Sequence, residues 1–309
     1  MIVLERPSGL RLFFALRGSI LPRIARSLAT CTALAVLVTV SHGVLFDWKV
    51  TLTTVPFSLI GLALAIFLGF RNSAAYERYW EARKLWGDLL HRTRSLARQV
   101  AALLADESSG LPAALRERMV RRTVAFAHAL RHQLRGSDPA EDFARWLGPD
   151  EARAIAASSL PTDWLLRRQA EDLGRALREG RVPAPQAAEV DVHLSGLAAV
   201  AAGCERIRHT PIPFAYTLLL HRTAYVYCFL LPFGLVDSIG VMTPFVVLIV
   251  AYTFFGLDAV GDEIEEPFGR MAHHLPLDAL CRTVEINLLE ALGEPERPVP
   301  LEPVDSVLL

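Results

Sequence analysis

Residues 56–80, PFSLIGLALAIFLGFRNSAAYERYW, decide the fold of this chain. Their first fifteen positions, 56–70, carry no charge, whereas the continuation from Arg71 is strongly polar. Beyond Arg71, neither proline nor glycine occurs before Gly87, so nothing in the sequence stops a helix there. We therefore predict one long helix that lies partly in a membrane and partly in water.

Large side chains form a row along the apolar part of this predicted helix. Ser58, Leu62, Ile66 and Phe70 are spaced four apart, which places them on one face. In the simpler interpretation, the large residues of this row contact lipid or a neighbouring helix. In the alternative, several copies surround an axis, and Leu62, Ile66 and Phe70 form a hydrophobic constriction of a pore.

The composition indicates a chain that is part membrane-embedded and part exposed to water. Of its 309 residues, 52% are hydrophobic and 21% are charged, and the formal net charge is -1. The near-neutral charge gives no reason to expect nucleic acid as a partner. The four cysteines lie far apart without a CxxC pair, so we predict small buried thiols rather than a disulfide framework or a zinc site.

Four apolar segments are candidates for membrane spans, and basic flanks orient them. The first loop, 42–54, has only Asp47 and Lys49 as charged residues and is predicted to be external. The predicted location is the cell's inner or plasma membrane, with both termini on the cytoplasmic side. The predicted spans are about 27–46, 55–70, 212–236 and 239–257. The arginines that precede the first span are Arg6, Arg11, Arg17, Arg23 and Arg26.

The remaining chain is predicted to be cytosolic and helical over 71–210 and 258–292, which gives an all-α fold. We take residues 1–292 as one domain and 293–309 as a proline-rich tail, extended and either disordered or laid against another subunit. Candidate helices are about 72–104, 112–135, 139–156, 162–179, 184–208 and 277–292. Breaks are predicted at 108–110, 136–139, 148–149 and 183–185.

Two groups of polar residues leave alternatives open. His221 and Arg222 interrupt the third apolar segment, either as an intramembrane ion pair or pore-lining charge, or as side chains that snorkel at the inner interface. The acidic run after the fourth segment either concentrates cations at a pore mouth, binds calcium, or is a solvated helical turn. This run consists of Asp258, Asp262, Glu263, Glu265 and Glu266.

The sequence gives no support for a metal site, a cofactor or an enzyme. His128 and His132 are four apart on a predicted helix, a spacing that can bind a metal, but arginines crowd them and we interpret this face as solvated. The chain lacks GxSxG, Walker, HExxH and dinucleotide-binding motifs.

Taken together, these segments resemble the bestrophin family, in particular its prokaryotic branch. The similarity covers nearly the whole chain in the same order and spacing. The segments that carry it are FLGFRN (67–72), RYWEARKLWG (78–87), IPFAYTLLLHRTAYVYCFLLPFG (212–234), DEIEEPFG (262–269) and LPLDALCRTVEINLL (275–289).

The resemblance implies a homopentameric ion channel with four spans per subunit and one axial pore. The family's hydrophobic neck would fall on Leu62, Ile66 and Phe70, and a lower cytosolic aperture on Ile212. Animal members are calcium-activated chloride channels, whereas some prokaryotic members conduct monovalent cations, so both kinds of monovalent ion stay open. The competing hypothesis is a non-conducting membrane scaffold that recruits a cytosolic partner.

One departure from the animal pattern concerns calcium. Animal members follow the PFG motif with a dense acidic cluster that helps to bind calcium, whereas here Gly269 is followed by RMAHH (270–274). The carboxylates of a dedicated calcium site are absent at that position. We therefore predict that micromolar calcium does not activate this chain as it does the animal relatives.

Overall fold

The structure is a computed structural model, and it describes most of the chain. The described residues are 1–3, 9, 15–16, 18–42, 44–45, 48–49, 53–104 and 111–309. Several predictions fall outside them: Arg6, Arg11, Arg17 and Asp47, and the break at 108–110.

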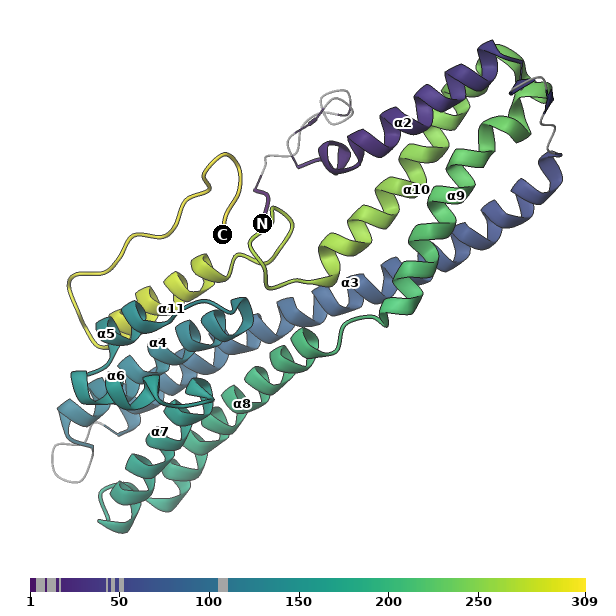
Figure 1. The fold of residues 1–309 in the computed structure, drawn as a ribbon. Helices are drawn as coiled ribbons and strands as arrows, with labels where there is room; N and C mark the ends of the chain where they lie inside the picture. Colours follow the sequence, from purple (N-terminus) through teal and green to yellow (C-terminus); the bar gives the residue numbers. More distant parts are fainter. Residues whose placement is uncertain are drawn as a thin grey trace. The chain divides into compact units, whose positions relative to one another are not determined.

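Helices dominate the fold, as predicted. Their bounds are α2 Leu21–Val40, α3 Thr54–Arg98, α4 Ala113–Arg135, α5 Ala140–Trp146, α6 Pro149–Ala156, α7 Pro161–Arg178, α8 Ala184–His209, α9 Phe214–Ile239, α10 Thr243–Glu265 and α11 Leu277–Ala291 (Figure 1). A π-helical turn, Gln99–Leu103, follows α3, and a 3-10 turn, Gly240–Met242, separates α9 from α10. Two short strands, β1 Val44–Leu45 and β2 Trp48–Lys49, pair antiparallel with Val44 opposite Lys49.

The chain divides into two compact units, which we describe separately. The apolar unit comprises 4–79 and 211–267, and the charged unit comprises 1–3, 80–210 and 268–309. Helix α3 is continuous over 45 residues and contributes to both units. The prediction of one uninterrupted helix from the apolar run into the polar continuation is therefore confirmed.

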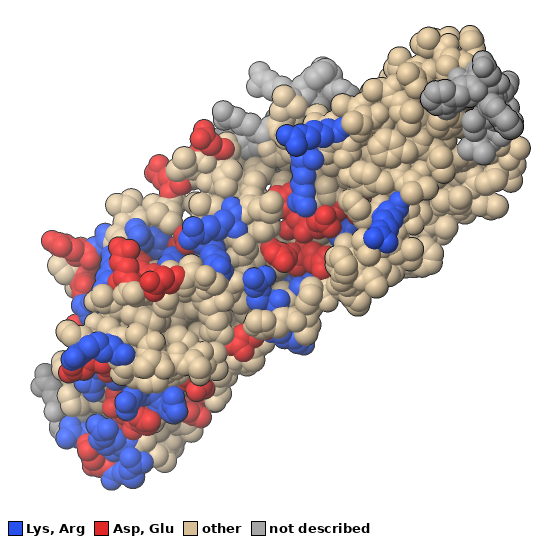
Figure 2. All heavy atoms as spheres, in the orientation of Figure 1, with Lys and Arg blue, Asp and Glu red and all other residues tan. Residues whose placement is uncertain are grey.

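The apolar unit is built around α2, α9 and α10, which pack on one another (Figure 1). Its core contains residues from all three helices and two leucines of α3, Leu64 and Leu68. Cys31 on α2 and Cys228 on α9 meet in this core. Figure 2 shows that, on the face in view, charged side chains over this unit gather near the start of α2 and the end of α10, while most of the remaining surface is without them.

The charged unit has its own core. Helix α4 packs against α5, α7, α8 and α11, and α7 packs against α8. Phe126 of α4 and Phe143 of α5 are completely or almost completely buried there. All four cysteines are free and buried, as predicted, and burial raises the pKa of the Cys204 thiol to about 12.

Helix bounds differ from the predicted spans where local chemistry overrides hydropathy. Helix α2 lies six residues earlier than the predicted 27–46, because Pro22 favours a helix start and the chain turns at Ser41 and His42. The turn between α9 and α10 lies at Gly240, not at Asp237 and Ser238, since glycine accepts the positive φ of 52°. Helix α10 continues eight residues beyond the predicted end, through the acidic run.

Within the described part of the chain, four helical segments are long and apolar enough to cross a membrane: Leu21–Val40, Thr54–Ala102, Ala184–His209 and Phe214–Glu265. The last of these joins α9, the 3-10 turn and α10, which we predicted as two spans. The alanine-rich α8, Ala184–His209, meets the same criterion, although it packs on α7 in the charged unit. The predicted four-span topology is therefore taken up again as a proposal.

The C-terminal tail contacts its own chain, unlike either predicted alternative. The backbone N–H of Ala279, in the first turn of α11, donates to the Leu309 oxygen at 2.9 Å, and Leu308 donates to the Met1 carbonyl at 2.8 Å. The first N–H groups of a helix have no partner within the helix, so an extended chain end can satisfy them. The division at residue 292 stays a prediction.

Candidate functional site

The candidate neck residues lie together on one uncovered face of α3. Leu62, Ile66 and Phe70 are 63%, 48% and 64% exposed. Leu64 and Leu68, on the opposite side of the helix, are buried in the apolar unit. An exposed row of large apolar residues needs a covering of lipid, of other copies or of a dewetted pore.

Close packing positions α3 against α9. A Cβ atom added at Gly61 would lie 2.7 Å from the Tyr227 hydroxyl, and one added at Gly234 would lie 2.5 Å from the Phe57 ring. Side chains at these two glycines would therefore clash with α9 or α3. Gly69, by contrast, has no atom within 4 Å of such a Cβ, so that face of α3 is open.

A buried arginine fixes α3 one residue beyond Phe70. The Arg71 side chain is 0% exposed, and its Nη1 donates to Asp258 Oδ1 at 2.7 Å. Its Nη2 pairs with Asp262 and lies 3.7 Å from Glu265 Oε2. A buried charge needs partners of opposite sign, and here three carboxylates of α10 supply them.

Further side chains extend this group, which we call the Arg71 cluster: Arg71, Asp258, Asp262, Glu265, His221 and Arg23. His221 Nδ1 lies 2.7 Å from Asp258 Oδ2, and Arg23 Nη2 lies 3.4 Å from Asp262 Oδ2. The cluster therefore joins α2, α3, α9 and α10. The cluster contains three carboxylates and two arginines.

The predicted pore-mouth acids are thus mostly engaged in pairs within the chain. Asp258, Asp262 and Glu265 belong to the Arg71 cluster, and Glu263 is buried. Glu266 also has a partner. Their placement at a pore mouth stays a prediction, but they do not form an acidic patch without counter-charges.

Ile212, the predicted aperture residue, lies beside the candidate neck within the apolar unit. Its backbone N–H donates to Glu265 Oε1 at 2.9 Å. Together with Phe70, Arg71 and Tyr216, it lines a cavity of about 600 Å³. The structure therefore brings the neck's last residue and Ile212 to one hollow, while the aperture role stays a prediction.

Contacts between α9 and α3 give the level of His221 and Arg222. The Tyr216 hydroxyl donates to the Phe67 carbonyl at 3.2 Å, and Tyr227 contacts Gly61. Positions 221 and 222 lie between Tyr216 and Tyr227, and hence beside the apolar stretch 61–67. His221 also contacts Asp258, the partner of Arg71, so the two residues lie toward the polar end of this stretch, and both alternatives, within the membrane or at its inner interface, stay predictions.

The interpretation of His128 and His132 as a solvated face is wrong. His128 is buried, with Nδ1 3.2 Å from Asp142 Oδ2 and Nε2 2.7 Å from Glu285 Oε1, and His132 Nε2 lies 2.7 Å from the same Asp142 oxygen. The nearby arginines point to carboxylates rather than to water, since Arg131 pairs with Asp142. Among the described residues, no group of three or more side chains is arranged to hold a metal ion.

These groups, His128, Asp142, Glu285, Arg131 and His132, form the His128 cluster. Burial lowers the pKa of His128, but the carboxylates of Asp142 and Glu285 raise it by more, so the net shift is upward. Burial raises the pKa of Glu285, but His128 and Arg282 lower it by more. Both shifts favour the charged pair.

Sequence patterns missed the partners in both clusters. Arg71 and Asp258 are 187 positions apart, and His128 and Glu285 are 157 positions apart, so no local spacing indicates either pair. One usable signal was the interval of four between Asp258 and Asp262, which places both carboxylates on one face of α10.

The chain is similar to known proteins over nearly its whole length. The family described as Bacterial/Fungal Bestrophin protein matches residues 1–290. A voltage-dependent anion channel-forming protein of Mesorhizobium japonicum is 45% identical over 98% of this chain and 96% of its own length. The voltage-dependent anion channel-forming protein YneE of Escherichia coli K12 is 42% identical over 98% of both chains.

A solved structure gives the same result for the fold. The crystal structure of a bacterial bestrophin homologue from Klebsiella pneumoniae matches with a TM-score of 0.83 and 42% sequence identity, over 88% of this chain and 99% of that one. These relatives are named for channel formation or as bestrophins rather than as enzymes. The chain belongs to the bacterial and fungal bestrophin family.

Proposed function

We propose that this chain is a passive ion channel in the cell's inner or plasma membrane. Five copies surround one axis, and small monovalent ions pass along it. The names of the relatives favour anions such as chloride, and monovalent cations are the alternative that the resemblance to prokaryotic members raises. Each subunit crosses the membrane with α2, the apolar part of α3, α9 and α10, and keeps both termini in the cytoplasm.

The exposed row on α3 is the observation that carries this proposal. Within one subunit, other helices cover a narrow face of α3, along Leu64, Leu68 and Arg71. Most of the remaining apolar half of α3 is exposed. A ring of α3 helices gives these uncovered faces partners. It also turns Leu62, Ile66 and Phe70 toward the axis, where three apolar rings gate by dewetting.

The charge arrangement supports a division of roles along the pore. Apolar rings have no charge, so they control passage more than they choose between ions. Arg71 follows Phe70 directly, but its charge is paired with carboxylates of its own subunit. Selectivity therefore depends on side chains beyond the neck, and Ile212 is our candidate for a second constriction.

The test is current through purified protein in a planar bilayer under an asymmetric KCl gradient. We expect a reversal potential near the chloride equilibrium value and a larger current for Ile66→Ala. Val36→Ala is the matched control, because Val36 on α2 is 47% exposed and Ile66 is 48% exposed. A potential near the potassium value would make this a cation channel.

Two outcomes would contradict the proposal. Equal currents for Ile66→Ala and the wild type would remove the neck from Ile66. Absence of current in the wild type and in Ile66→Ala, with an intact oligomer, would favour a membrane scaffold.

A further inference from the structure

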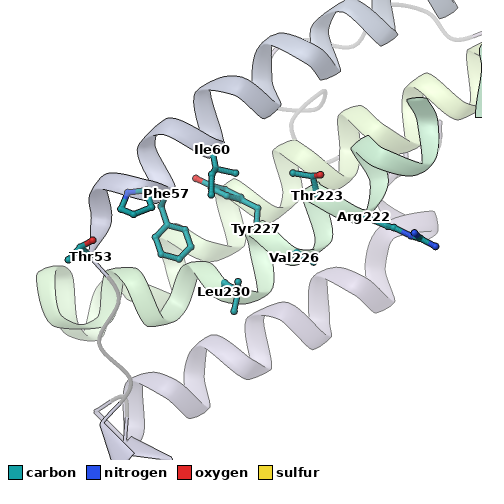
Figure 3. A pocket seen from close by; sticks show the side chains of 9 residues that line it. Thr53, Phe57, Ile60, Arg222, Thr223, Val226, Tyr227 and Leu230 are labelled. Atoms are coloured by element: carbon teal, nitrogen blue, oxygen red, sulfur yellow. The ribbon is translucent and has the colours of Figure 1, made fainter. Parts of the chain in front are cut away.

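A groove in the apolar unit runs between the start of α3 and the middle of α9. It encloses about 630 Å³. Figure 3 shows that α3 contributes Phe57 and Ile60, while α9 contributes Val226, Tyr227 and Leu230. Ile60, Val226 and Leu230 are exposed, so the groove is open at the surface of the unit.

Arg222 borders this groove without a partner. Among the described residues, its side chain has neither a hydrogen bond nor an ion pair, although it is exposed beside apolar neighbours. In Figure 3 the guanidinium points away from Thr53, which precedes the start of α3. Because Arg222 lies beside the apolar half of α3 and apolar groove residues, its guanidinium is stabilised if an anion reaches it.

A second copy of the chain is poorly suited to supply that anion. Copies related by rotation about the membrane normal place equivalent residues at equal depth, and the carboxylate at this depth is Asp258, which contacts His221. Asp258 is buried and already pairs with Arg71. Asp237 lies fifteen residues further along α9, about 22 Å away at 1.5 Å per residue, and has its own partner.

We propose that the groove binds one acyl chain of an anionic phospholipid and that Arg222 pairs with the phosphate of the same lipid. The apolar lining matches a hydrocarbon chain, and the arginine matches a phosphate, to which it can donate two parallel hydrogen bonds. The side chain of Arg222 is long enough to snorkel toward the headgroup region. In the proposed topology this headgroup lies in the cytoplasmic leaflet, where anionic lipids are abundant.

The test is native mass spectrometry of the purified protein after incubation with equal amounts of phosphatidylglycerol and phosphatidylcholine that have identical acyl chains. We expect the wild type to retain phosphatidylglycerol preferentially. Arg222→Gln should reduce this preference about tenfold, since a charge-assisted hydrogen bond is lost. Arg26→Gln is the matched control, because Arg26 on α2 is exposed and likewise has no side-chain partner among the described residues.

A second variant tests the acyl chain separately. Val226→Trp fills the groove and should reduce retention of both lipids, whereas Val36→Trp on the exposed face of α2 should not. If Arg222→Gln does not fold, Arg222→Lys should keep the preference, and the effect of Val226→Trp decides.

Three results would overturn the inference. One is equal retention of both lipids by the wild type, and another is an unchanged preference in Arg222→Gln. The third is a loss of oligomer mass in Val226→Trp with unchanged lipid retention, which would assign the groove to a neighbouring subunit. The inference rests on the membrane position of α3 and α9 but not on conduction, so it can fail while the channel proposal holds.

Discussion

The Arg71 cluster and the His128 cluster solve the same problem with different cations. Each buries several carboxylates at a meeting of helices, the first in the apolar unit and the second in the charged unit. Arginine keeps its charge at any pH that a protein survives, whereas histidine changes charge near neutrality. The central cation of the Arg71 cluster therefore keeps its charge, whereas the central cation of the His128 cluster depends on pH.

The largest expected effect comes from removing the permanent cation. Arg71→Met leaves Asp258, Asp262 and Glu265 without their central cation, whereas Arg23 and His221 still contact Asp262 and Asp258. Breaking a buried ion pair in this way costs about 3–5 kcal/mol. We expect a large fall in the thermal midpoint of the detergent-solubilised protein, measured by tryptophan fluorescence.

The exposed Arg26 provides the control for this change. Arg26→Met should leave the midpoint nearly unchanged, because Arg26 has no side-chain partner among the described residues. Adding Asp258→Asn to Arg71→Met should recover part of the loss. Equal midpoints for Arg71→Met and the wild type would show that the cluster does not stabilise the fold.

Sequence patterns predicted the frame around the first cluster better than the cluster itself. The absence of proline and glycine between Arg71 and Gly87 indicated a continuous α3, and the structure confirms it. The interval of four placed Leu62, Ile66 and Phe70 on one face, because helix periodicity is local. The pairing of Arg71 with Asp258 depends on how α10 packs against α3, and no local pattern contains that information.

In the second cluster, a correct spacing led to a wrong environment. His128 and His132 do share a face of α4, as their spacing predicted. The arginines around them suggested a solvated surface, but Arg131 and Arg135 pair with Asp278 on α11. A basic stretch is solvated only if no acidic helix covers it, and sequence does not reveal which helix does.

The second prediction removes the central histidine of the charged unit. His128→Leu leaves Asp142 and Glu285 without one partner each, but Arg131 and Arg282 still pair with them. The loss should therefore be smaller than for Arg71→Met, about 2 kcal/mol. His209→Leu, at the exposed end of α8, is the matched control in the same thermal melts. A similar midpoint for both variants would contradict a stabilising role of His128.

The third prediction concerns pH and sharpens the contrast between the two cations. The pKa of His128 is raised in the folded state, so its stabilisation is complete below its unfolded pKa of about 6.5. That stabilisation is lost as the pH rises through the folded pKa. The thermal midpoint of the wild type should therefore fall with rising pH more than that of His128→Leu.

The comparison between these two proteins is needed because another histidine acts in the opposite direction. Burial and nearby Arg92 lower the pKa of His193, so its contribution increases with pH. His193 is present in both proteins, and its effect cancels in the difference. Parallel pH profiles for the wild type and His128→Leu would refute the pH-dependent role of His128.

The smallest expected effect tests whether burial, rather than pairing as such, gives both clusters their strength. Arg153 pairs with Asp150 in α6, but the two side chains are 79% and 93% exposed. Water screens such a pair, so Arg153→Ala should change the free energy of unfolding by less than about 0.5 kcal/mol. Arg122 of α4 has a side chain that is only 5% exposed, and it pairs with Glu151 of α6 and with Asp172 of α7. Arg122→Ala should therefore destabilise the protein far more than Arg153→Ala. Equal losses of unfolding free energy for Arg153→Ala and Arg122→Ala would show that burial does not strengthen these ion pairs.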